Sequence, residues 1–234
     1  MKNFSNTYIF IFSAVMVVIV ALLLSTAALQ LKPFQDKNIE VEKKQNILGS
    51  IRITSTPVDA VDLYAKYITS SFVVNNKGEK LEGEDAFSID IKKELSKPAA
   101  DRKLPVYVGT LDNGTNAYVM PVRGKGLWGP IWGYVSLKPD MNTIYGVVFD
   151  HQGETPGLGA EIATEFFQTP FIDKQLFKDS TEFVSIKVLK GGAPEGDMHS
   201  VDAISGGTIT SKALEEMLDT CLVQYKTFYI QNRQ

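Results

Sequence analysis

The sequence predicts an α+β domain preceded by a single N-terminal transmembrane helix. Three observations support this fold class: a long uncharged apolar run near the N-terminus, a series of apolar segments joined by hairpin-type turns, and a final segment whose apolar residues recur every three or four positions. The hairpin turns favour a mixed, mainly antiparallel sheet with helices packed against it.

Composition excludes several classes of protein. The chain has 234 residues, of which 44% are hydrophobic, enough for one or two domains with a real core. A net charge of −3 provides no basic surface, so we predict no nucleic-acid partner. Cys221 is the only cysteine and there are two histidines, which excludes an internal disulfide or a cysteine-ligated cluster. We therefore predict no metal site and no catalytic side chain acting alone.

The first predicted element is an apolar helix. Tyr8 to Leu29 is a run of 22 residues without a charge, long enough as a helix of roughly 33 Å to cross a membrane. A cleaved signal peptide is the alternative, but this run exceeds the usual length of such an apolar region. We predict a membrane anchor at 1–31, a polar connector at 32–50 and an α+β region at 51–234. Lysines on both sides of the run leave its orientation open.

A helix and three hairpins are expected next. The helix begins at "STPVDAVDLYAKYI", with Ser55 or Thr56 as its N-cap and Pro57 in its first position. "SFVVNNKGEKLEG" predicts two strands that turn at Gly78. "LPVYVGTLDNGTNAYVMPV" predicts a second hairpin around 112–114, and "IWGYVSLKPDMNTIYGVVFDH" predicts a third around its Pro-Asp turn.

The C-terminal part mixes helices with one strand. We expect a short helix from Ala160 to Phe167, a strand in "EFVSIKVLK" and a long helix from Thr210 to about Ile230. Apolar residues of this last helix form one stripe, and Cys221 lies on it, so a buried and unreactive thiol is expected.

The segment "GKGLWG", Gly124 to Gly129, matches the dinucleotide-binding pattern G-x-G-x-x-G. That pattern requires a helix after its last glycine, whereas Pro130 and a predicted strand follow here. We interpret the segment as a hairpin loop, in which Leu127 and Trp128 either pack on the domain or contact a flat ligand.

The segment "DAISGGTITS", residues 202–211, places four hydroxyl side chains and two glycines directly before the last helix. Helix N-termini have unpaired N–H groups and a partial positive charge, and glycines allow close backbone approach, which together suit a phosphate. Simple capping of the helix explains the same residues. The spacing of a P-loop is absent.

A second glycine-rich segment is "HQGETPGLGAEI", residues 151–162. Gly157 and Gly159 flank Leu158, so this loop can present backbone and one aliphatic side chain to a planar ring. His151 is expected to be structural, and Glu154 and Glu161 to be solvated.

These two motifs together resemble the FMN-binding domain family found in the C subunit of sodium-pumping NADH:quinone oxidoreductases and in the G subunit of the Rnf complex. "DAISGGTITS" resembles the flavinylation signature Asp-x-x-Ser/Thr-Gly-Ala-Thr, with Gly207 in place of the usual alanine. "GKGLWGPIWGYVSL" is more similar to the version found in the oxidoreductase than to the Rnf version. The resemblance places the FMN-binding domain at about 100–232.

The resemblance implies covalent FMN, attached by a phosphoester to Thr208 by a separate flavin transferase. It implies a flavin-carrying subunit that relays electrons from NADH toward quinone, inside a complex that exports Na⁺, in the bacterial inner membrane with the soluble domain on the periplasmic side. The other subunits of that complex are the expected partners. The expected FMN-contacting residues are Asp202, Ser205, Gly206, Gly207, Ile209 and Thr210 around the phosphate, and Leu127, Trp128, Thr155, Pro156, Gly157, Leu158 and Gly159 around the ring.

Two alternatives remain at this level. One is the Rnf subunit, which also carries covalent flavin. The other is a non-redox, membrane-anchored binding module in which the hydroxyl-rich turn only caps the last helix.

Overall fold

The computed structural model describes residues 5–233. Contacts divide the chain into two compact units, 1–43 and 44–234. The described part of the first unit is helical and belongs to α1 (Asn6–Ser50), which contains Pro33 and continues through the predicted connector into the second unit. By length and composition, α1 is apolar enough to cross a membrane.

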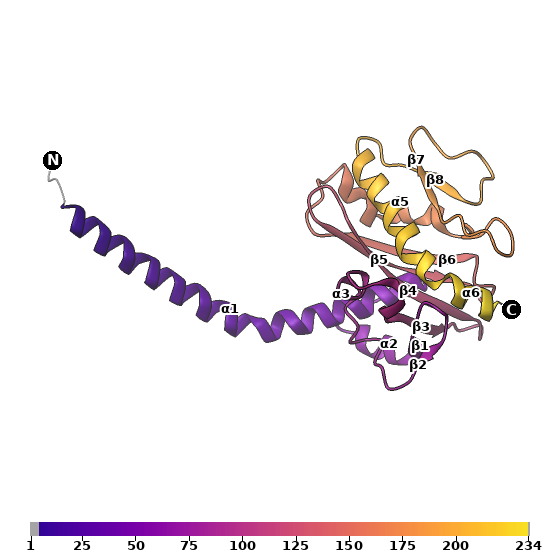
Figure 1. The fold of residues 1–234 in the computed structure, drawn as a ribbon, viewed down its shortest axis with the longest axis horizontal. Helices are drawn as coiled ribbons and strands as arrows, with labels where there is room; N and C mark the ends of the chain where they lie inside the picture. The colour runs from indigo at the N-terminus through magenta and orange to yellow at the C-terminus, as the bar shows by residue number, and fades with distance from the viewer. Residues whose placement is uncertain (1–4, 234) are drawn as a thin grey trace. The chain divides into compact units, whose positions relative to one another are not determined.

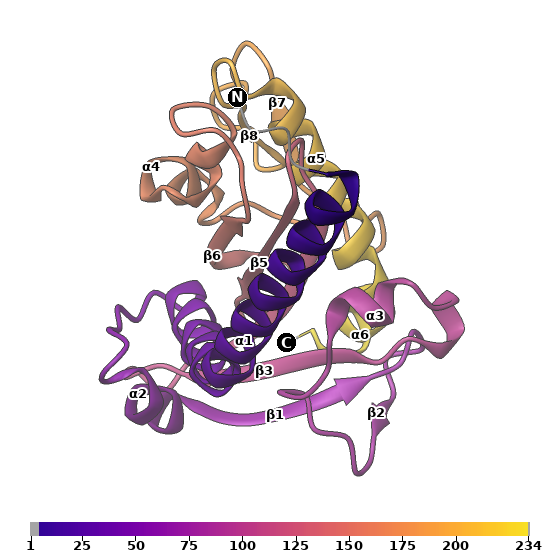
Figure 2. The ribbon, with the colours of Figure 1, turned by 90° about the vertical axis from the view of Figure 1, so that its left-hand side faces the viewer.

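The second unit is built on an antiparallel six-stranded sheet with the order β2-β1-β3-β4-β5-β6 (Figures 1 and 2). The three predicted hairpins form as expected, and Gly78 and Gly114 take the positive φ that the turns of the first two require. The strands are β1 (Ile68–Val74), β2 (Lys80–Leu81), β3 (Leu104–Thr110), β4 (Asn116–Lys125), β5 (Pro130–Leu137) and β6 (Ile144–His151).

Side chains alternate between two apolar cores on the two faces of the sheet. On β4, Met120 joins the larger core and Val119 the smaller one. The larger core is closed by α5 (Thr208–Leu222), η4 (Val223–Tyr225) and α6 (Lys226–Asn232). The smaller core contains the last residues of α1 and a flank of α2 (Ala60–Tyr67). The α+β prediction is therefore confirmed.

Three helix boundaries differ from expectation. The helix predicted at Ser55 begins at Ala60, with Asp59 as N-cap, and the Asp59 carboxylate instead accepts the Thr56 N–H at 2.6 Å. The Asp carboxylate thus closes the turn before the helix, in place of a hydroxyl cap. The last helix begins two residues early and tightens to a 3₁₀ turn at η4, where the buried Tyr225 hydroxyl donates to the Pro105 carbonyl.

The segment between β6 and α5 is less regular than predicted. The single helix expected at 160–167 is divided into η2 (Gly159–Ala163) and α4 (Glu165–Gln168), because Thr164 leaves the helical conformation to cap α4. The strand expected in "EFVSIKVLK" is only β7 (Lys187–Leu189), since Ser185 has a φ of 56°. β7 pairs in parallel with β8 (Ser200–Asp202). Two short helices, α3 (Ile91–Leu95) and η1 (Ala99–Asp101), precede β3, and η3 (Thr169–Phe171) follows α4.

Candidate functional site

The structure brings the three motif segments together at one end of the sheet. "GKGLWG" forms the loop between β4 and β5, closed by the Gly126 N–H donating to the Gly129 carbonyl at 2.7 Å. This confirms the hairpin interpretation over a nucleotide-binding turn. "HQGETPGLGAEI" runs from the end of β6 into η2, and "DAISGGTITS" runs from β8 into α5.

The junction of the three segments is Glu154. Its Oε1 accepts the Trp128 N–H at 2.9 Å, and its Oε2 accepts the Thr210 hydroxyl at 2.6 Å. The expectation that Glu154 is solvated is wrong, since only 4% of the residue is exposed. A lone carboxylate between glycines gives no sequence signal of burial, because its partners lie 26 and 56 residues away.

The four hydroxyl side chains of 202–211 fall into two groups. Thr210 and Ser211 are buried; Thr210 donates to Glu154, and Ser211 Oγ accepts the Ile204 N–H at 3.0 Å. Ser205 is exposed and Thr208 is partly exposed, and within residues 5–233 neither hydroxyl has a hydrogen-bond partner. Thr208 and Ser205 are therefore the hydroxyls of this segment that remain open to chemistry.

Thr208 is the first residue of α5, where, within residues 5–233, the backbone N–H groups lack hydrogen-bond acceptors. Gly207 is the N-cap and supplies no side-chain bond, and in the described chain the N–H groups of 208–210 have no acceptor. Orphan N–H groups at a helix start, together with the helix dipole, favour an anion. A phosphate group would fit this position, where no side chain caps α5.

Glycines make the close contacts within this site possible. A Cβ on Gly206, whose φ is 75°, would lie 2.6 Å from Leu158 Cδ2, so this turn packs directly on the Leu158 side chain. Gly207 has a φ of −101°, which an alanine can adopt, but its Cβ would lie 2.8 Å from Ile204 Cγ2. An alanine at position 207 would therefore require the Ile204 side chain to move, whereas glycine allows its close approach.

Exposed apolar side chains occur on all three segments, which is the surface that an isoalloxazine ring requires. Trp128 is 69% and Ile209 60% exposed, and the other two are Leu127 and Leu158. Thr155, Pro156 and Gly157 are exposed around them, whereas Gly159 is buried beneath the carboxylate of Glu154. These residues fit a flat, partly apolar ligand.

Asp202, the first residue of the signature, and His151 each accept one backbone N–H. Asp202 Oδ1 accepts the Ala193 N–H at 2.6 Å, and the carboxylate is exposed. His151 Nδ1 accepts the Glu154 N–H at 3.2 Å, a contact within its own loop. In the described part of the chain, no group of three or more His, Cys, Asp or Glu side chains could hold a metal ion.

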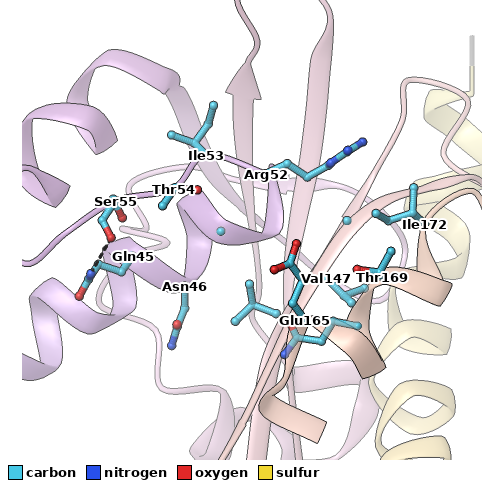
Figure 3. Close-up of a pocket in the computed structure, with 14 residues that line it drawn as sticks. Gln45, Asn46, Arg52, Ile53, Thr54, Ser55, Val147, Glu165, Thr169 and Ile172 are labelled. Atoms are coloured by element: carbon cyan, nitrogen blue, oxygen red, sulfur yellow. Dashed lines mark hydrogen bonds between the residues drawn. The ribbon is translucent and has the colours of Figure 1, made fainter. Parts of the chain in front are cut away.

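Two surface hollows adjoin the signature. One, of about 540 Å³, is lined by Gly126, Ile209 and Ala213 and by charges of both signs, namely Lys125, Lys187, Lys212, Glu215, Glu216 and Asp219. The other, of about 430 Å³, lies beside Ser205 and Ile204 and is lined by the exposed Phe166. A larger hollow of about 600 Å³ lies between the end of α1, β6 and α4, and none of the predicted site residues lines it (Figure 3).

Comparison with known proteins gives a consistent result. Residues 126–223 match the family described as the FMN-binding domain. The chain is 33% identical over 215 residues to the C subunit of the Na⁺-translocating NADH-quinone reductase of Vibrio vulnificus, covering 85% of this chain and 84% of that protein. It is also 33% identical over 214 residues to the same protein of Haemophilus ducreyi, covering 84% and 82% of the two chains.

Solved structures agree with these sequence matches. The structure of the C subunit from Parabacteroides distasonis superposes with a TM-score of 0.78 at 46% identity, covering 85% of this chain and 96% of that one. The NqrC structure from Shewanella oneidensis gives 0.70 at 30% identity, covering 82% and 96%. These relatives are all C subunits of one enzyme, so the chain belongs to the NqrC family of the Na⁺-translocating NADH-quinone reductase and is a subunit of that oxidoreductase with an FMN-binding domain.

Proposed function

We propose that Thr208 carries FMN through a phosphoester, and that the protein relays electrons from NADH toward quinone within a complex that exports Na⁺. The observation that carries the proposal is the state of the Thr208 hydroxyl: it is partly exposed and unbonded in residues 5–233, at a helix start with three free N–H groups. The family membership of the chain supplies the cofactor.

The attachment step balances as a transfer from FAD. The Thr208 oxygen forms a bond to the phosphorus of the FMN half, the P–O–P bond of FAD breaks, AMP leaves, and the hydroxyl proton is released. A neutral hydroxyl is a weak nucleophile, so a separate Mg²⁺-dependent flavin transferase performs this step. Thr208 is thus a modification site and not a catalytic residue.

The chain's own residues then bind and orient the cofactor. The N–H groups that open α5 stabilise the phosphate, and Ser205 and Gly206 lie in the turn before them. Leu127, Trp128 and Leu158 supply apolar surface for the ring. Bound FMN supplies the one-electron redox chemistry of the subunit.

We place the soluble domain on the periplasmic side of the bacterial inner membrane, anchored by α1. A covalent link has a physical use there, since a flavin that dissociates outside the cytoplasm is not replaced from the cytoplasmic pool. The link also fixes the distance to neighbouring redox centres in the other subunits. One helix has no partner with which to line an ion path, so Na⁺ crosses elsewhere in the complex.

The test is co-expression of the full chain with the flavin transferase. We expect a fluorescent band on a denaturing gel, and a tryptic fragment 191–212 heavier by FMN less one water. Thr208→Val should remove both signals and leave the fold intact, since the Thr208 hydroxyl makes no described hydrogen bond. Ser205→Ala, the matched control at the other open hydroxyl, should retain both. Covalent flavin in the Thr208→Val protein would refute the assignment.

A further inference from the structure

We infer that Glu154 is a positioning residue that fastens the three motif segments to one another, so that the ring-binding surface is assembled before any flavin is attached. The part of this inference that concerns the ring rests on the proposed function. The part that concerns the protein's own loops stands on the contacts of the chain alone.

The two carboxylate oxygens of Glu154 each hold a different segment. Oε1 takes the main-chain N–H of Trp128 in the β4–β5 loop, and Oε2 takes the side-chain hydroxyl of Thr210 in the first turn of α5. The residue itself belongs to the segment after β6, where its own N–H donates to His151 Nδ1. One side chain therefore links three segments that are distant in sequence.

This carboxylate depends on these two hydrogen bonds. It is almost fully buried, and among residues 5–233 no lysine, arginine or histidine forms an ion pair with it. A buried carboxylate without a cation is stabilised by hydrogen bonds from N–H and O–H groups, and such charge-assisted bonds are the stronger kind. The hydrogen bonds from the Trp128 N–H and the Thr210 hydroxyl are therefore stronger than hydrogen bonds between neutral groups.

The backbone around Glu154 is shaped to admit its carboxylate. A Cβ on Gly126 would lie 2.5 Å from Oε1, and a Cβ on Gly159 would lie 2.4 Å from Oε2. Both positions would clash with the bonded carboxylate if they carried a side chain. Gly126 and Gly159 therefore leave the space that the Glu154 carboxylate occupies, in addition to any contact with a ligand.

Trp128 shows why such a link is needed. Its side chain is largely exposed, so burial does not fix its position, and the loop around it is only four residues long. Within the described chain, the bond to Glu154 is the one that the Trp128 N–H makes. Without it, the loop tip keeps only the turn bond between Gly126 and Gly129.

The experiment is hydrogen–deuterium exchange of the full chain in detergent, without flavin, read by mass spectrometry at the Trp128 amide. Glu154→Ala should accelerate exchange of this amide by at least about tenfold, the equivalent of one charge-assisted hydrogen bond. Glu154→Gln keeps one acceptor oxygen of the same reach but loses the charge, and should recover part of the protection. Glu161→Ala is the matched control, because Glu161 accepts the Gly157 N–H within the same loop and its side chain has no described hydrogen bond to either of the other two segments.

Unchanged exchange at Trp128 in Glu154→Ala overturns the inference. If that variant loses protection throughout the sheet, Thr210→Val replaces it, since it removes only the bond to Oε2. Faster exchange confined to the Ser211 amide, which donates to the Gly207 carbonyl at 2.9 Å, and to the β4–β5 loop then supports the inference. Wild-type exchange at both places overturns it.

A second readout concerns the ring. In flavinylated protein, Glu154→Ala should lower the anisotropy of flavin fluorescence and weaken its visible circular dichroism, while Glu154→Gln should restore both. A merely stabilising residue would lower the melting temperature without moving these signals, and that outcome would also overturn the inference. If wild-type protein matured with the transferase carries no flavin, the proposed function fails, but the exchange result on flavin-free protein still decides the role of Glu154.

Discussion

The Ser136 hydroxyl lies 2.6 Å from the carbonyl oxygen of Ser50 and donates a hydrogen bond to it, which ties the last residue of α1 to strand β5. Both residues are fully buried. The end of α1 is therefore part of the domain core, and Ile47, Leu48 and Ile51 belong to the smaller apolar cluster.

This contact predicts two different outcomes for two N-terminal truncations. Deletion of 1–43 should give a soluble, folded domain, because the deleted unit shares little of the core. Deletion of 1–54 should destabilise the domain by about 1.5–3 kcal/mol for each of the three buried apolar side chains lost with it. Urea unfolding of the two proteins compares them, and equal stabilities would show that the α1 end is dispensable.

Gly159→Ala should lower the free energy of unfolding by about 1–3 kcal/mol, the usual cost of forcing extra atoms into a packed site. The new Cβ would lie 2.4 Å from both Glu154 Oε2 and Thr210 Oγ1, which are bonded to each other and buried. Gly153→Ala in the same loop is the control, since its Cβ would meet nothing within 4 Å. Thermal denaturation of both variants tests this, and a stable Gly159→Ala protein would contradict the tight packing described here.

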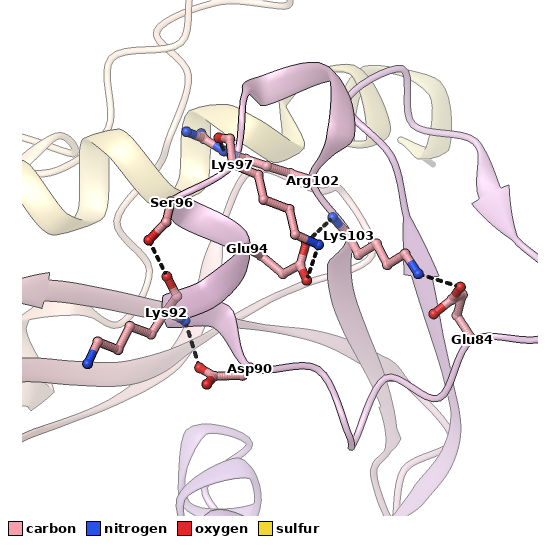
Figure 4. A network of polar contacts seen from close by, with 8 residues as sticks. All are labelled: Glu84, Asp90, Lys92, Glu94, Ser96, Lys97, Arg102 and Lys103. Carbon is pink, nitrogen blue, oxygen red and sulfur yellow. Dashed lines mark hydrogen bonds and ion pairs between the residues drawn. The ribbon is translucent and has the colours of Figure 1, made fainter.

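Glu94 should make the domain's stability depend on pH. Burial raises the pKa of Glu94, but hydrogen bonds from the Lys97 ammonium and the Lys103 N–H outweigh it, so the pKa is lowered overall (Figure 4). A carboxyl whose pKa is lower in the folded state contributes stability above its unfolded pKa of about 4.5 and loses it as the pH falls through the folded value.

Glu94→Gln should therefore cost roughly 1–3 kcal/mol at pH 7, and the gap to wild type should narrow below about pH 4.5. Glu84→Gln is the control from the same network, because its bond to Lys103 at 2.6 Å is partly exposed to solvent, whereas Glu94 is buried, and such a pair is worth about 0–1 kcal/mol. Urea unfolding at several pH values measures both. A Glu94→Gln deficit that stays constant into acid would rule out the assigned linkage.

Cys221 should be unreactive in the folded protein. Burial raises the pKa of its thiol, and the sulfur lies 3.3 Å from the Arg123 carbonyl, to which it donates. A thiol-specific reagent should label it only after unfolding in urea. Cys221→Ser should keep covalent flavin after maturation. Rapid labelling of native protein, or loss of flavin in that variant, would indicate a role for the thiol in the site.

The hairpins show which parts of the fold are predictable. Their turns depend on local residues such as Gly78 and Gly114, so the six strands follow from nearby sequence. The strand expected before Lys187 failed for a different reason. Its apolar pattern is that of a strand, but Ser185 has a positive φ and Phe183 forms an isolated bridge with Phe177. Both features depend on how this whole region packs.

The candidate site divides in the same way. Sequence alone determined the fold class, the apolar helix and the two glycine-rich motifs that resemble an FMN-binding domain, because each depends on residues close together in the chain. Only the tertiary structure decided which hydroxyls are open and which are committed, and that Glu154 is a buried junction and not a solvated acid. The physical reason is that hydrogen-bond partners 26 and 56 residues apart are chosen by the folding of the sheet, and no local pattern encodes their meeting.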